Sequence, residues 1–295
     1  MAEKGAANAK MSVAKILHQS VMGGCYVGFG GLLSLSIAGS LARAVDGNPG
    51  LGKLVFAALF PVNLLLILMS GGQLFTGNSA SVPAALCEGL VSKGELVKSW
   101  VVSYLGNICG CGLFALAASY TGLLTGGTAE LAAATAVKKC AGRFGPTLVK
   151  AVMCNWLVCM AVFLAGAAND LGGKMVGIWF PISTFVAIGF EHSVANLFLL
   201  PLGCLAGADV SLSEIVFKNL LPVTIGNATF ANTSAAGDSW QAAHVQLSSS
   251  WQRAQRRSRE RSDARGRSRR VRPAAVRWRN SEDRRWRGRR WAEAA

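Results

Sequence analysis

Two ionisable residues, Glu191 and His192, lie inside an apolar stretch that runs from about residue 175 to 206. A charge at the centre of a membrane helix costs about 2.5–3.5 kcal/mol, so these residues need a reason to be there. Imidazole titrates near neutral pH, and His192 on a water-filled path could exchange a proton with a weak acid. The alternative is a neutral histidine bonded to neighbouring backbone. We expect Glu191 to be structural, capping freed backbone N–H groups.

Thr76 lies in a second polar interruption, the sequence GGQLFTGN of residues 71–78. Its hydroxyl could bond His192 or a passing solute. The alternative role is to cap the following half-helix, together with Asn78. The N-termini of two half-helices that meet at one point would favour a small anion, because each carries a partial positive charge.

Other kinds of chemistry find little support in the sequence. The eight cysteines contain no C-x-x-C pair, and nearly all lie in apolar runs, so we expect packing residues rather than a metal or redox site. We see no metal-ligand cluster, nucleophile–base pair or phosphate-binding loop, and we expect neither a cofactor nor an enzyme.

The composition indicates an all-α integral membrane protein. Hydrophobic residues make up 52% of the chain and charged residues only 15%, whereas soluble proteins have about a quarter charged residues. Uncharged runs such as Leu54–Cys87, with 34 residues, suit membrane helices of about 20 residues each. We predict apolar segments at about residues 20–42, 54–87, 99–121, 148–168 and 175–206, with a sixth beginning near Leu220. Loops join them, the longest at 130–147.

The second and fifth segments are each interrupted in the middle. Exposed backbone cannot face lipid, so such breaks are tolerated only beside a protein-lined cavity, and a matched pair of them marks a solute site. A repeated spacing also supports two related halves. Asn107 follows nine residues after Lys98, and Asn227 follows nine residues after Lys218. The pattern predicts two inverted three-helix repeats.

The positive charge belongs to the C-terminal end. Residues 235–295 hold 17 of the 30 Lys and Arg residues and 6 of the 15 acids. We therefore divide the chain into an N-terminal segment of residues 1–19, a transmembrane domain of residues 20–230, and an Arg-rich, disordered tail of residues 231–295. Residues 12–20 could form a short amphipathic helix that leads into the membrane.

Four motifs resemble the formate/nitrite transporter family: LFTGN at 74–78, CNWLVC at 154–159, GFEHSVAN at 189–196 and NLLPVTIGN at 219–227. The resemblance covers about residues 12–228. It implies an aquaporin-like six-helix bundle, a homopentamer with one pore per protomer, and cytoplasmic termini. It also implies passage of formate, nitrite, hydrosulfide or lactate, together with protons. Of the membranes that could hold it, we expect the plasma membrane.

The resemblance also implies roles for individual residues. The central histidine falls on His192 and the loop threonine on Thr76, which Leu74 and Phe75 precede. One apolar constriction would comprise Phe60, Leu64 and Leu74, and the other Phe185. The vestibule lysine falls on Lys139 and its asparagine partner on Asn155. We also include Glu191, the residue before His192, among the candidate residues of the transport pathway. A bare anion cannot cross apolar rings cheaply, so protonation would precede passage.

Two departures from the family pattern stand out. Gln73 replaces an acid that often precedes Leu-Phe-Thr. After Asn227 the chain turns polar, so the sixth helix looks truncated, and the switch from Lys to Arg is typical of translation in another frame or of an unspliced intron.

Alternative interpretations remain. One is an aquaporin-like channel for neutral solutes, although this chain lacks Asn-Pro-Ala boxes. Another is an inactive, truncated subunit. The tail could bind RNA or anionic lipid head groups, but we expect no nucleic-acid partner.

Overall fold

Helices form all of the regular secondary structure that the computed structural model describes, which covers residues 1–41 and 48–235, the last six as backbone only. In chain order these are α1 (Ala2–Lys10), α2 (Val13–Ser40), α3 (Pro49–Leu59), α4 (Val62–Ser70), α5 (Phe75–Cys87), α6 (Lys93–Tyr120), α7 (Gly126–Cys140), α8 (Phe144–Ala167), α9 (Leu171–Ile188), α10 (Ser193–Leu205), the π-helix η1 (Glu214–Leu220) and α11 (Leu221–Ala235).

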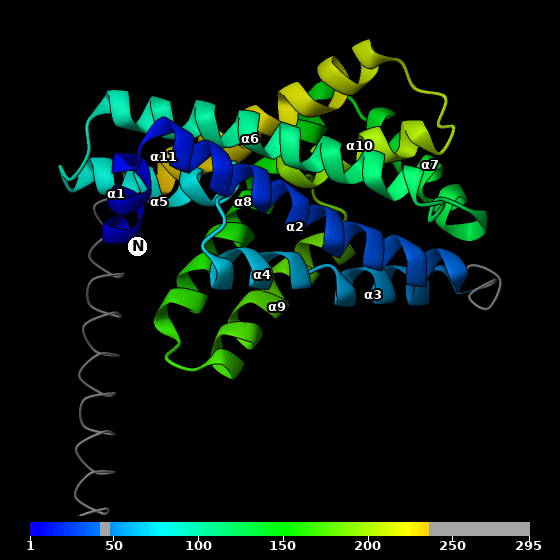
Figure 1. Ribbon diagram of the computed structural model, residues 1–295, viewed down its shortest axis with the longest axis horizontal. Coiled ribbons are helices and arrows are strands. Elements are labelled where there is room, and N and C mark those ends of the chain that lie inside the picture. Colours follow the sequence, from blue (N-terminus) through cyan, green and yellow to red (C-terminus); the bar gives the residue numbers. More distant parts are fainter. Residues whose placement is uncertain (42–47, 236–295) are drawn as a thin grey trace, which may run out of the picture. The chain divides into compact units, whose positions relative to one another are not determined.

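Five helical segments within the described residues are long and apolar enough to cross a membrane. They are Val13–Ser40, Pro49–Ser70, Lys93–Tyr120, Phe144–Ala167 and Leu171–Ile188. The second comprises α3 and α4, which lie almost end to end (Figure 1). The chain is therefore a multi-pass, all-α membrane protein, as the uncharged runs predicted.

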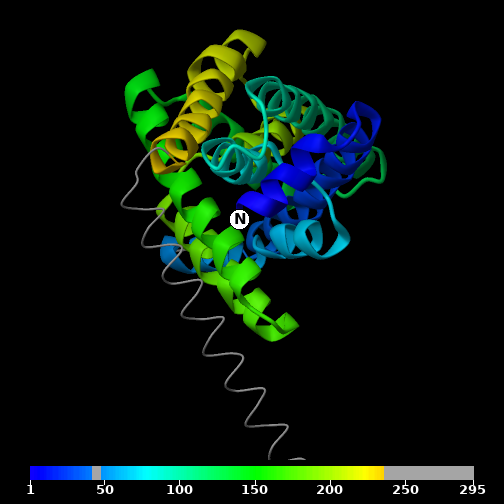
Figure 2. The same cartoon turned by 90° about the vertical axis from the view of Figure 1, so that its left-hand side faces the viewer.

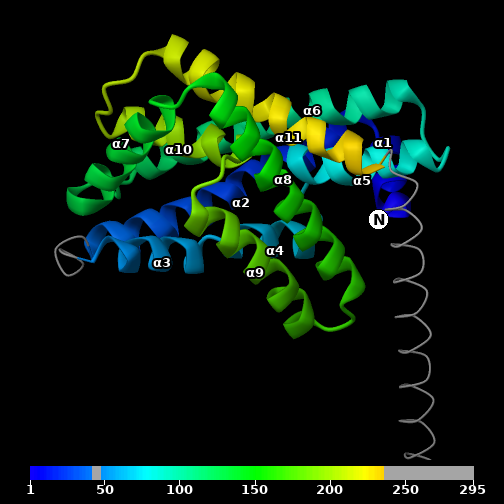
Figure 3. The same ribbon diagram turned by 180° about the vertical axis from the view of Figure 1, so that it is seen from behind.

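Two equivalent sets of helices build the bundle. In the first, α2 packs along α6, and the chain between them passes through α3, α4 and the half-helix α5. In the second, α8 packs along α11, with α9 and the half-helix α10 between them (Figure 3). The α8–α9 hairpin is clear in Figure 2. This arrangement agrees with the repeats that the paired breaks predicted.

Close approach of α2 and α6 depends on glycine. A Cβ atom on Gly24 would lie 2.7 Å from the carbonyl oxygen of Asn107 and 2.7 Å from the backbone nitrogen of Cys111. Real Cβ atoms do not come so close to backbone, so any larger residue would push the two helices apart.

The N-terminal segment differs from the expectation of a short helix at residues 12–20. Ser12 instead caps α2, accepting a hydrogen bond from the Lys15 backbone, so residues 13–20 are the first turns of the first spanning helix. A separate helix, α1, precedes it and packs its alanines against α5.

The predicted loop at 130–147 is also different, since most of it is α7. Five alanines from Ala129 to Ala136 explain the helix, because alanine has the highest intrinsic helix propensity. The sixth segment continues as α11 beyond Asn227 to Ala235. Its 15 residues directly follow the 7 residues of η1, and the described residues end at Ala235. Of the tail that the sequence predicted to be disordered, residues 231–235 belong to α11, and the rest lies outside the described residues.

Candidate functional site

Each break begins at a glycine with a left-handed backbone. Gly71 ends α4 with a φ of 81°, and Gly189 ends α9 with a φ of 88°. This conformation is easy only for a residue without a Cβ. Four residues then separate α4 from α5, and four separate α9 from α10. The two breaks are therefore built alike.

Two buried asparagines hold the breaks with the same three hydrogen bonds. Asn107 of α6 accepts from the Phe75 backbone N–H at 2.9 Å and donates to the carbonyls of Ser20 and Gln73. Asn227 of α11 accepts from the Ser193 N–H at 2.8 Å and donates to the carbonyls of Ala151 and Glu191. Each asparagine thus ties a half-helix N-terminus to the first long helix of its half, α2 or α8.

The sequence pointed to Asn107 and Asn227 by their spacing from a lysine, but it gave them no role. The available signal was a primary amide in an otherwise apolar helix. Such a group must find hydrogen-bond partners inside the protein, because lipid offers none.

His192 is the residue at the second break whose side chain faces the first. Its Nδ1 accepts a hydrogen bond of 2.9 Å from the Ala195 backbone N–H, so the ring caps α10. Because a backbone N–H can only donate, Nδ1 carries a lone pair, and the proton of the neutral ring is on Nε2. Nε2 therefore donates to Thr76 Oγ1, 2.9 Å away. The predicted contact between Thr76 and His192 is present, and both residues are buried.

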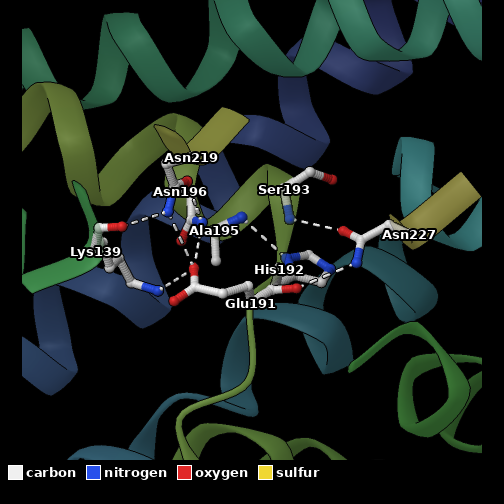
Figure 4. A network of polar contacts seen from close by, with 8 residues as sticks. All are labelled: Lys139, Glu191, His192, Ser193, Ala195, Asn196, Asn219 and Asn227. Carbon is white, nitrogen blue, oxygen red and sulfur yellow. Dashed lines mark hydrogen bonds and ion pairs between the residues drawn. The ribbon is translucent and has the colours of Figure 1, made fainter. Parts of the chain in front are cut away.

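Glu191 accepts from side chains and not from the backbone N–H groups that the sequence analysis expected it to cap. Its Oε2 lies 2.9 Å from Lys139 Nζ, 2.7 Å from Asn196 Nδ2 and 3.4 Å from Asn219 Nδ2 (Figure 4). His192 already provides the cap, which leaves the carboxylate free to pair with the ammonium group. Asn196 and Asn219 lie within the motifs at 189–196 and 219–227, but the sequence indicated no role for them.

The equivalent position in the first break is Gln73. Its Oε1 accepts from Asn78 Nδ2 at 2.9 Å, and its Nε2 donates to Gln19 Oε1 at 2.7 Å. Asn78 and Asn196 therefore play matching parts, five residues after Gln73 and Glu191. The first break is held by neutral amides, whereas the second contains an ion pair.

Two hollows meet beside the breaks. A wide vestibule of about 710 Å³ is lined by Lys139, Glu191 and His192 among others, and it also receives Lys53, Lys138 and Lys150. A small chamber of about 10 Å³ lies next to it. Phe60, Phe185 and His192 line both hollows, so the two phenylalanines mark the boundary between them.

The remaining candidate residues lie around the chamber, with the exception of Phe75. Phe60, Leu64 and Leu74 line the chamber together with Phe185, and the two phenylalanines also line the vestibule. Phe75 lines neither hollow and packs against Trp100 and Tyr104, with ring centroids 6.1 and 5.0 Å away.

Asn155 is not the partner of Lys139 in the hydrogen bonds described. It donates to the Asn227 carbonyl at 2.7 Å and to Ser79 Oγ at 3.2 Å, which ties α8 to α11 and α5. Lys139 instead pairs with Glu191. The resemblance paired Lys139 with Asn155 by their positions in the family pattern. Such positions carry no information on side-chain direction.

Membrane-spanning helices, two matched breaks and a hollow leading to a buried chamber define a multi-span channel or transporter. The model of the formate/nitrite transporter family matches residues 1–230, and the chain belongs to this family. It is thus a transport protein and not an enzyme. The predicted tail is outside the matched residues.

Known relatives agree with this assignment. The chain is 43% identical to a probable formate transporter of Methanothermobacter thermautotrophicus, over 74% of this chain and 85% of the relative. It is 34% identical to the formate channel BtFdhC of Bacillus thuringiensis, over 76% and 85%.

Two solved structures have the same aquaporin-like fold. An FNT family ion channel superposes with a TM-score of 0.73 at 29% identity, over 82% of this chain and 96% of that one. A pentameric formate channel with formate bound gives a TM-score of 0.67 at 26% identity, over 75% and 93%.

Proposed function

We propose that the chain conducts small monovalent anions of weak acids, formate and nitrite first among them, and that each anion crosses together with a proton. The family description and the names of the relatives support these substrates. The observation that carries the proposal is the order of environments along the two hollows: a lysine-rich vestibule, a phenylalanine boundary, and a chamber that holds the neutral His192.

The vestibule concentrates the anion. Four lysines line it against a single acid, Glu191, which Lys139 already neutralises. A net positive hollow with apolar walls raises the local concentration of anions. Lys139 thus serves both to attract the solute and to keep the buried carboxylate paired.

The boundary and the chamber favour the neutral acid. Phe60 and Phe185 are each 3% exposed and offer no hydrogen bond to a carboxylate, so a bare anion pays heavily to pass them. A formate ion that binds one proton becomes formic acid, and the charge penalty disappears. Leu64 and Leu74 form the apolar lining beyond, together with His192, whose Nε2–H is bonded to Thr76.

Three further parts of the proposal concern the surroundings. We infer a homopentamer from the pentameric formate channel that the chain resembles, and a position in the plasma membrane. Residues 1–19 lie on the cytoplasmic side and residues 231–295 form a tail that conduction does not need. Phe75 and Asn155 support the path through packing and hydrogen bonds, without touching the solute.

Uptake of labelled formate into proteoliposomes tests this function. With an acid exterior, the chain should take up formate faster than protein-free vesicles, and His192→Ala should reduce the rate. The exposed Asn169→Ala serves as the control. Uptake of a neutral solute such as glycerol, with no formate uptake, would favour an aquaporin-like channel. If neither solute enters, the chain is an inactive subunit.

A further inference from the structure

The central chamber contains a second polar residue, Asn63. Seven of the nine residues that line the chamber are apolar, and the other two are Asn63 and His192. Asn63 lies in the first turn of α4 and is 4% exposed. Its Nδ2 is buried without a hydrogen-bond partner among the described residues.

The polar atoms of His192 are already engaged. Its Nδ1 accepts from the Ala195 backbone, and its Nε2 donates to Thr76. The amide of Asn63 is therefore the free hydrogen-bond donor of the chamber. Buried donors in folded proteins almost always have a partner. An unpaired donor beside a chamber therefore suggests a ligand that binds there transiently.

A neighbouring glycine makes room for this amide. A Cβ on Gly30 of α2 would lie 2.8 Å from Asn63 Cβ and 3.0 Å from Asn63 Nδ2. Any larger residue on α2 would push the amide out of its position. Gly30 and Asn63 thus form a matched pair that keeps an N–H donor beside the chamber.

From this arrangement we infer that Asn63 is a specificity-determining residue that donates a hydrogen bond to an acceptor oxygen of the passing solute. The inference rests on the proposed function and narrows it, because formic acid, formate and nitrite all have such oxygens. Hydrosulfide has only a weak sulfur acceptor. A site built to hydrogen-bond one group discriminates against analogues that lack it, because its own polar atom stays unpaired.

The test combines transport with stability, in the variant Asn63→Leu, which has the same branching without the amide. Formate and nitrite uptake should fall about tenfold, in keeping with the net contribution of a single hydrogen bond. Hydrosulfide uptake should stay the same or rise. Asn169→Leu, on the exposed α8–α9 loop, is the matched control. An unchanged ratio of formate to hydrosulfide uptake would overturn the inference.

Thermal unfolding of the purified protein provides a readout that needs no transport. If the amide is kept for a solute, removing an unpaired buried donor should raise the unfolding temperature of Asn63→Leu in solute-free buffer. A lower unfolding temperature would show that Asn63 serves the fold. The inference would then fail even if the parental chain takes up formate normally.

The size-matched pair Asn63→Ser and Asn63→Ala covers the case in which leucine does not fit beside Gly30. Serine keeps a donor and should retain more formate uptake than alanine, whereas equal rates would contradict the inference. A parental chain that moves neither formate nor nitrite would instead refute the proposed function. The unfolding temperatures would then still decide whether Asn63 is an unpaired donor.

Discussion

The hydrogen bond between His192 and Thr76 joins the two halves of the bundle at their breaks. Thr76→Val has nearly the same shape but cannot accept from Nε2–H. An unpaired buried donor costs about 1–3 kcal/mol, so we expect a lower unfolding temperature and slower formate uptake. Thr76→Ser keeps the hydroxyl and should behave like the parental chain. Equal stability and uptake for the valine and serine variants would show that this bond has no role.

The ion pair of Lys139 and Glu191 has side chains only 16% and 10% exposed. Lys139→Met would leave a nearly buried carboxylate without a counter-charge, and we expect a loss of about 3 kcal/mol in the free energy of unfolding. The double variant Lys139→Met/Glu191→Gln should recover most of this loss, since the amides of Asn196 and Asn219 still have an acceptor. Denaturant unfolding in detergent measures both. No recovery would mean that the ammonium group acts through other contacts.

At the scale of the elements, the paired asparagines fix the shape of both breaks. Asn227→Ala removes three buried hydrogen bonds and frees the backbone of Glu191 and Ser193, on either side of His192. We expect stability to fall by about 3 kcal/mol or more and formate uptake to fall as in His192→Ala. Asn107→Ala should lower the stability by a similar amount. Its effect should fall on the first break, where it frees the backbone on either side of Leu74, at Gln73 and Phe75.

Circular dichroism and thermal unfolding, with Asn169→Ala as the exposed control, measure these effects. Asn227→Asp gives a sharper comparison. It keeps the acceptor for the Ser193 N–H but replaces both donated hydrogen bonds with carboxylate oxygens that face carbonyls. It should be at least as destabilising as alanine, and a stable, active aspartate variant would contradict the hydrogen-bond assignment.

The sequence predicted the breaks well because they depend on local signals. Glycine and polar residues at 71–78 and 189–196 interrupted long apolar segments, and the structure places the breaks at residues 71–74 and 189–192. The uncharged runs likewise located the spanning helices. In each case the signal lies within a few residues of the feature that it predicts.

Apart from the Thr76–His192 contact, which the matched breaks indicated, partners distant in the sequence could not be predicted in the same way. Lys139 reaches Glu191 across 52 positions, and the resemblance had paired it with Asn155. Phe185 was assigned to a separate constriction, and in the structure it lines the same chamber as Phe60, Leu64 and Leu74. These contacts depend on how α7, α3 and α9 pack, which neither hydropathy nor motif spacing specifies. Residues 126–140 are helical for a local reason, their alanines, which the loop assignment overlooked.

At the scale of the whole molecule, the chain divides into a unit of Met1–Gln246, which contains the entire family match, and a unit of Leu247–Ala295. Both hollows, both breaks and both asparagines belong to the first unit. A domain with its own core is expected to fold without a neighbouring unit. The proposed conduction therefore requires nothing from residues 247–295.

A chain that ends at Gln246 tests this division. We expect it to unfold at the same temperature as the full chain, to form the same oligomer, and to take up formate at the same rate per protomer. A pentamer that requires Leu247–Ala295 would show up as smaller particles in size-exclusion chromatography with light scattering. Faster uptake by the shortened chain would indicate that the second unit inhibits the pore. Slower uptake by a correctly assembled oligomer would show that conduction depends on the second unit, and the path assigned to the first unit would then be incomplete.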